Sequence, residues 1–98
     1  MSNVANFLIF QVRYNQEHTH IIAVMQVRNQ PNSIPTQIGR LEVITNIHAG
    51  LKYATAYHDN GTWNYGNEVF VEEVGGTEYI KTEPDDRLAD NLGELPEF

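Results

Sequence analysis

Short segments of alternating apolar and polar residues, separated by turn-forming residues, dominate the sequence. Side chains two positions apart lie on the same face of a strand, so this alternation indicates strands rather than helices. Residues 7–14 and 18–28 follow the pattern, and the polar residues 15–17 between them predict an antiparallel hairpin. In the first segment we expect four large apolar residues to share one face: Leu8, Phe10, Val12 and Tyr14.

Residues 29–35 interrupt this pattern, because two prolines and two asparagines cannot continue a strand ladder. A helix is predicted for residues 40–49, with Gly39 as its N-cap and Gly50 as the residue that ends it. Its apolar stripe, at helical spacing, is expected to contain Val43, Ile44, Ile47 and Leu51. The helix is short, so packing against the sheet must stabilise it.

Three further strands are predicted at residues 51–57, 67–74 and 78–82. Asn60-Gly61 tolerates the positive φ angles of a tight hairpin turn, and Gly75-Gly76 marks a second turn. We therefore predict that residues 1–98 form a single α+β domain. It has an antiparallel sheet of about five strands, in the order β-β-α-β-β-β, and one helix that covers a face.

The carboxyl-terminal segment, residues 84–98, continues well beyond the last predicted strand. Pro84 stops that strand, and Leu88, Leu92 and Leu95 then recur at the spacing of one face of a helical turn. A disordered acidic tail seldom has leucines at such intervals. We expect an ordered tail whose leucines pack on the sheet while its carboxylates face water.

The charge is unevenly distributed. The net charge is −7, but residues 1–52 carry about +2 and residues 53–98 about −9. The acidic half would repel a phosphate backbone, so we expect no direct binding of nucleic acid and favour a protein partner or self-association. The chain contains no cysteine, and its first residues resemble neither a signal peptide nor a membrane span. These features predict a cytoplasmic protein without a membrane partner.

Aromatic and acidic residues of the second half form the predicted interaction surface. Exposed aromatic side chains anchor protein interfaces, and acidic residues on a strand discourage unwanted edge pairing. The candidates are Tyr57, Trp63, Tyr65, Glu68, Glu72, Asp85, Asp86 and Asp90.

Catalytic chemistry has little support in the sequence. Glu72 and Glu73 point to opposite faces of their strand, and there is no serine in a nucleophile-like context and no glycine-rich phosphate loop. His18 and His20 are two positions apart and are weak candidates for metal ligands, but no spacing identifies a third ligand. We therefore expect no catalytic residues, no cofactor and no bound metal.

Two carboxyl-terminal stretches resemble a known family. Tyr79-Ile80-Lys81-Thr82, followed by Asp90-Asn91-Leu92-Gly93-Glu94-Leu95-Pro96, is similar to the end of small bacterial proteins grouped as domain of unknown function 3892. A short helix around residues 41–47 and the Asn-Gly hairpin extend the resemblance upstream. It implies a compact bacterial domain whose tail belongs to the fold, and it brings no catalytic residues.

The most consistent prediction is a non-enzymatic protein-interaction module of bacterial origin, with a homodimer as one possible form. Two alternatives stay open. One is an acidic inhibitor or nucleic-acid mimic encoded by a phage or mobile element, which requires one continuous acidic face. The other is a small metal-dependent enzyme, which requires a pocket that joins the histidines to carboxylates.

Overall fold

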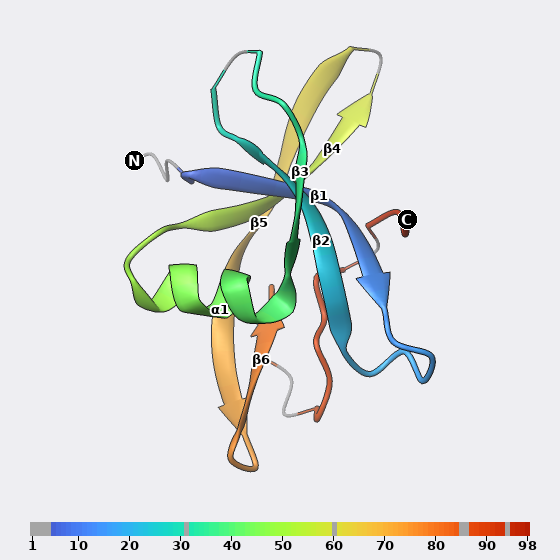
Figure 1. Cartoon of the computed structure of the whole chain (residues 1–98), viewed down its shortest axis with the longest axis vertical. Helices are drawn as coiled ribbons and strands as arrows, with labels where there is room; N and C mark the ends of the chain where they lie inside the picture. Colours follow the sequence, from blue (N-terminus) through green and yellow to red (C-terminus); the bar gives the residue numbers. More distant parts are fainter. Residues whose placement is uncertain (1–4, 31, 60, 85–86, 94) are drawn as a thin grey trace.

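The computed structural model describes residues 5–30, 32–59, 61–84, 87–93 and 95–98. Along these ranges the elements are β1 (Phe7–Tyr14), β2 (Ile21–Arg28), β3 (Thr36–Gly39), α1 (Arg40–His48), β4 (Tyr53–Asp59), β5 (Thr62–Val74) and β6 (Thr77–Lys81). The strands form one sheet in the order β3-β2-β1-β4-β5-β6 (Figure 1). Neighbouring strands are antiparallel, except that β1 and β4 run parallel.

The sheet contains six strands, one more than the sequence predicted. The additional strand, β3, begins directly after Pro35 and pairs with β2 at the edge of the sheet. Four residues are too few to show a period of two, so the pattern of side chains does not reveal this strand. The α+β class and the single helix are confirmed. The parallel pair arises because the chain crosses back through α1 before it enters β4 beside β1.

A bulge in β1 divides the residues that were expected on one face. The register of β1 against β2 shifts at two points. Between Ile9 and Gln11 the extra residue belongs to β1 and reverses the alternation of its side chains, whereas between Arg13 and Tyr14 the extra residue belongs to β2. Leu8 and Phe10 therefore lie with a second apolar cluster, whereas Val12 and Tyr14 lie with the main core. The prediction that these four residues share a face was wrong.

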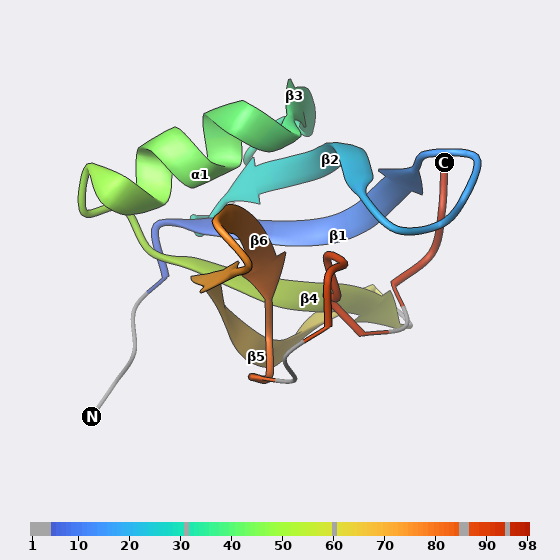
Figure 2. The ribbon, with the colours of Figure 1, turned by 90° about the horizontal axis from the view of Figure 1, so that it is seen from below.

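The main core lies between the sheet and α1, which covers one side of β1 and β2 (Figure 2). Val43 and Ile44 are buried, and Ile47 and Leu51 pack against them, which confirms the predicted stripe. In the part of the chain that the structure describes, no helix is long and apolar enough to cross a membrane. The buried members of this core are Ile9, Val12, Ile21, Val24, Val43, Ile44, Tyr53, Val69, Ile80 and Leu92.

Tyr53 joins three elements in this core. Its side chain is fully buried and its ring stacks on Phe7, with 5.3 Å between the ring centroids. Its hydroxyl donates a hydrogen bond to Gln26 Oε1 of β2 at 2.9 Å and accepts one from Asn46 Nδ2 of α1 at 3.0 Å. The buried hydroxyl is thus satisfied, and it ties the helix and β2 to β4.

We expect two tyrosines to titrate late. Burial raises the pKa of Tyr53 above the ordinary value of 10.0, the hydrogen bond from Asn46 opposes this rise, and Glu42 adds to it. Burial also raises the pKa of Tyr14, with added repulsion from Glu97 and Asp90. Because the folded-state pKa exceeds the unfolded one, stabilisation by the neutral hydroxyls is complete below about pH 10 and is lost as the pH rises through the folded-state values.

Tyrosinate absorbance measured against pH checks this expectation. The folded protein should show late-titrating groups that move back toward the ordinary value in denaturant. Tyr53→Phe should remove one of them. A titration curve that is unchanged by that substitution would contradict the assignment.

β5 changes partner part-way along its length. Its first part pairs with β4 as far as Val69, and from Phe70 onward it pairs with β6. The β5–β6 hairpin therefore turns away from the rest of the sheet (Figure 1). The sheet is curled, with an open side between β6 and the middle strands.

The carboxyl-terminal segment closes this open side. Asn91 forms an isolated bridge with Lys81 of β6, and Glu97 forms another with Val12 of β1. Five backbone hydrogen bonds of 2.9–3.0 Å join the segment to these two strands and to the turn before β2. The tail therefore connects the last strand of the sheet to one of its middle strands.

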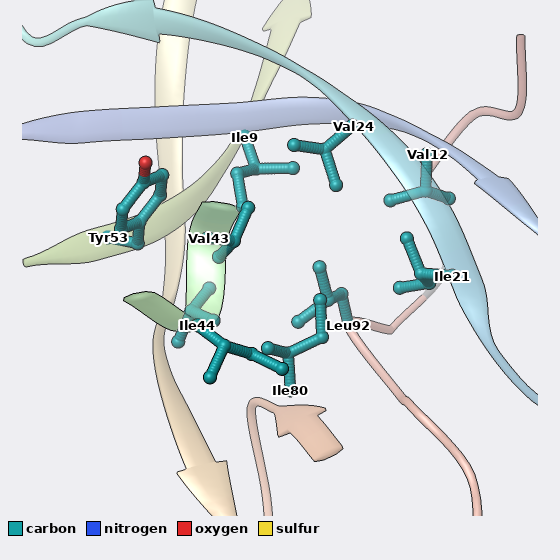
Figure 3. Packing of buried hydrophobic residues seen from close by; sticks show 10 residues of the cluster. Ile9, Val12, Ile21, Val24, Val43, Ile44, Tyr53, Ile80 and Leu92 are labelled. Carbon is teal, nitrogen blue, oxygen red and sulfur yellow. The ribbon is translucent and has the colours of Figure 1, made fainter. Parts of the chain in front are cut away.

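The tail leucines meet the expectation only in part. Leu92 is 2% exposed and lies between Ile21 of β2 and Ile80 of β6 (Figure 3). Leu95 packs against the same core, but Leu88 is 63% exposed. The described tail residues form no helix, so the helical interpretation of the leucine spacing was wrong. The extended tail instead places Leu92 through its backbone bonds to β6.

Candidate functional site

Asp90 is the centre of a polar junction inside the molecule. Its side chain is completely buried. Oδ2 accepts hydrogen bonds from the backbone N–H of Ile21 and from Arg40 Nε, both at 2.7 Å. Oδ1 accepts from the backbone N–H of Ile80 at 2.9 Å and from Arg40 Nη2 at 3.2 Å. Arg40 also donates to the backbone carbonyl of Glu78. One carboxylate thus connects β2, α1, β6 and the tail.

This arrangement corrects the prediction for Asp90. We expected its carboxylate on an interaction surface, with the other acidic residues of the tail facing water. The structure instead places it where four donors compensate its charge, which is the condition for burying a carboxylate. Asp90 is therefore a structural residue.

Glu72 is likewise held by a cation. Its Oε1 lies 2.8 Å from Nζ of Lys81, whose side chain is fully buried. Lys81 Nζ also donates to the backbone carbonyl of Arg87 at 2.9 Å. The side chain of Glu72 is only 20% exposed, so this carboxylate neutralises a buried ammonium group and does not extend the interaction surface.

The two histidines have different partners. The ring of His18 stacks on Tyr14 with 4.1 Å between centroids, and its Nε2 lies 3.2 Å from Glu97 Oε2. His20 stacks on Tyr79, with Nδ1 3.9 Å from the buried carboxylate of Asp90. Among the described residues, no group of three or more histidine, cysteine, aspartate or glutamate residues is arranged to hold a metal ion.

Two adjoining cavities form a groove beside the second apolar cluster. The first has a volume of about 370 Å³ and is lined by residues that include Ala5, Ala54, Gly66 and the charged residues Lys52 and Glu68. The second has a volume of about 400 Å³ and is lined by Leu8, Val27, Arg28, Gln30, Asn32 and Ser33. Asn29 and Tyr65 line both cavities. We call this feature the Tyr65 groove.

The sheet geometry explains why an aromatic side chain stands in this groove. Tyr65 is 63% exposed, yet its hydroxyl donates a 3.0 Å hydrogen bond to Asn29 Oδ1, which follows β2. Although β1 and β4 separate β2 from β5 in the sheet, Asn29 lies beside the start of β1, where its backbone N–H bonds to the carbonyl of Asn6 and its side-chain amide to the carbonyl of Ala5. The floor beneath it belongs to the second cluster, which includes Leu8 and Ala56 and no described residue of α1.

Gly66 keeps β5 close to β4 at the edge of the groove. A Cβ atom at this position would lie 2.3 Å from Thr55 Oγ1, which is closer than side-chain carbons approach. That hydroxyl accepts a hydrogen bond from the backbone N–H of Asn67 at 3.0 Å. Gly66, which lines the first cavity, therefore allows the close approach of β5 to β4 at this point.

The structure brings together two of the predicted surface residues and places the other described ones, Tyr57, Glu72 and Asp90, elsewhere. Tyr65 and Glu68 both line the first cavity. Tyr57 is 52% exposed but does not line the groove. The side chain of Trp63 and residues Asp85 and Asp86 lie outside the described part of the chain.

Sequence reasoning missed the other side of the groove. Arg28, Asn29 and Lys52 lie at strand ends and in a loop far from Tyr65 in sequence, and only the sheet order brings them together. The dense amides of residues 29–32 were the available signal, but we interpreted them only as strand breakers.

The fold and the groove define a small single-domain α+β protein with a curled sheet, one helix and an integral carboxyl-terminal tail. The chain belongs to the family described as "Protein of unknown function (DUF3892)", which matches residues 8–96. The match confirms the family resemblance seen in the sequence. Comparisons with curated proteins and with solved structures found no significant match.

Proposed function

We propose that this protein is a non-enzymatic interaction module that binds an extended segment of a partner protein in the Tyr65 groove. The observation that carries the proposal is the position of Tyr65, which is exposed and lines both cavities beside apolar residues. Tyrosine is enriched at the energetic centres of protein interfaces, because it offers a large rigid ring and a hydroxyl at low entropic cost.

The chemistry of the groove suits a peptide backbone. Its apolar floor includes Leu8, Val27 and Ala54, which can accept an apolar side chain. The amide side chains of Asn29, Gln30 and Asn32 offer both donors and acceptors, which an extended chain requires for its exposed N–H and C=O groups. The volumes of the two cavities fall in the range usual for ligand sites.

The acidic-mimic alternative receives less support. It requires the carboxylates of the second half on one continuous face. Asp90 is buried against Arg40, and Glu72 is paired with Lys81, so two of the acidic residues are withdrawn from any such face.

Selection from a random-peptide library on the immobilised protein tests the proposal. We expect enriched peptides whose addition shifts the backbone amide resonances of Asn29, Ala54 and Gly66. Tyr65→Ala should weaken their binding about tenfold or more, as expected for a central interface residue. Tyr57→Ala, which removes another exposed tyrosine outside the groove, should leave affinity unchanged.

Two outcomes would overturn the proposal. The first is that the selection enriches no peptide whose binding is weakened by Tyr65→Ala. The other is a concentration-dependent dimer whose interface protects the same resonances, because a second copy of the chain would then occupy the groove. Sedimentation of the free protein across a range of concentrations distinguishes this second outcome.

A further inference from the structure

We infer that the segment bound in the Tyr65 groove is acidic, with a carboxylate placed against Arg28 and an apolar side chain beside Tyr65. This inference rests on the proposed function and specifies the chemistry of the partner.

The first observation is how the cations of this acidic protein are used. Arg40 binds Asp90, Lys81 binds Glu72, and Arg13 donates to the backbone carbonyl of Phe98 and lies over its ring. Arg28 and Lys52 are different. Both are exposed, both line the groove, and neither takes part in any ion pair formed among the described residues.

The second observation is the orientation of Arg28. Its guanidinium lies 5.7 Å from the centre of the Phe7 ring, which lines a neighbouring cavity together with Arg28, so this cation–π contact places Arg28 at the boundary between that cavity and the second cavity of the groove. A guanidinium stacked on a ring keeps its N–H groups in the plane available for a bidentate carboxylate. Among the described residues that line the second cavity, Arg28 is the one that carries a charge. The described lining of this end of the groove therefore carries one positive charge and no negative one.

The third observation is that the two ends of the groove differ in charge. The first cavity contains Glu68 as well as Lys52, so its two charges oppose each other. The second cavity has no such opposing carboxylate in its described lining. A bound acidic side chain is thus favoured at the Arg28 end, and the molecule, with a net charge of −7, disfavours acidic segments elsewhere on its surface.

Three matched synthetic peptides test the inference. Each contains a central phenylalanine, flanked by glutamates in one peptide, glutamines in the second and lysines in the third. We expect affinity to fall in that order and the advantage of the glutamate peptide to shrink as salt is added. Arg28→Gln should reduce the affinity for the glutamate peptide about two- to fivefold, as for one exposed ion pair, and leave the glutamine peptide unaffected.

The outcomes separate the inference from the proposed function. Arg87→Gln makes the same change in net charge outside the groove and should not alter the order of affinities. Equal binding of the three peptides, with each weakened by Tyr65→Ala, would overturn the acidic partner and retain the groove. Preference for the lysine peptide would likewise overturn the acidic partner and retain the groove. Failure of all three peptides and of the library selection would overturn both.

Discussion

Replacing Asp90 with alanine is expected to lower the free energy of unfolding by about 3–5 kcal/mol. The substitution removes the acceptor of four hydrogen bonds and leaves Arg40, whose side chain is only 17% exposed, without its carboxylate. A buried cation without a partner costs more than the pair contributed, because its desolvation is no longer compensated. Since small domains are stable by about 5–15 kcal/mol, this variant should unfold readily.

Urea unfolding followed by circular dichroism measures this effect. Glu97→Ala is the matched control, since it removes a half-exposed tail carboxylate that contacts His18, and it should change stability by less than about 1 kcal/mol. In a double-mutant cycle, Asp90→Ala with Arg40→Ala should cost less than the sum of the two single changes. An Asp90→Ala variant as stable as the Glu97→Ala control would show that the junction does not hold the tail.

The second large effect is expected from Leu92→Ala, at about 2–5 kcal/mol. Leu92 fills the space between Ile21 and Ile80 (Figure 3), and the tail backbone on one side is fixed by its bonds to β6. The surroundings can therefore collapse only in part, so the deletion should leave a cavity as well as lose buried apolar area.

Leu88→Ala provides the comparison for this variant. The two leucines are four residues apart in the same tail, but Leu88 is 63% exposed. Its replacement should change stability by about 0.5 kcal/mol or less. Thermal and urea unfolding of both variants would check the difference. If both variants lost the same free energy of unfolding, the tail leucines would stabilise the protein through backbone propensity and not through burial.

The sequence predicted the parts of the fold that depend on local pattern. The α1 stripe and the β4–β5 hairpin follow from side-chain spacing and turn chemistry, although Asn60 of the predicted turn lies outside the described residues. The packing of Leu92 on the core was also predicted, but not the extended backbone that places it there. The side assignments in β1 failed because a bulge needs no distinctive residue and reverses every position after it. β3 was missed because its four residues are too few for a period to appear.

The candidate site was less predictable, and the reason is its long-range construction. Tyr65 and Glu68 could be proposed from aromatic and acidic character alone. Arg28 and Lys52 could not, because their importance depends on the sheet order and on which other cations are already paired. Asp90 was predicted to be exposed although it is buried, because the sequence around a carboxylate in an acidic stretch does not indicate which donors surround it.

The two tail bridges, at Lys81 and Val12, also bear on how the protein is made. During translation the amino-terminal strands leave the ribosome first, while the segment that holds Asp90 and Leu92 is still inside the exit tunnel. Until that segment emerges, the backbone N–H of Ile21 and the guanidinium of Arg40 lack the carboxylate that accepts their hydrogen bonds. The core cannot be completed before Asp90 and Leu92 have left the tunnel, so a nascent chain shorter than this should expose apolar surface that holdase chaperones recognise.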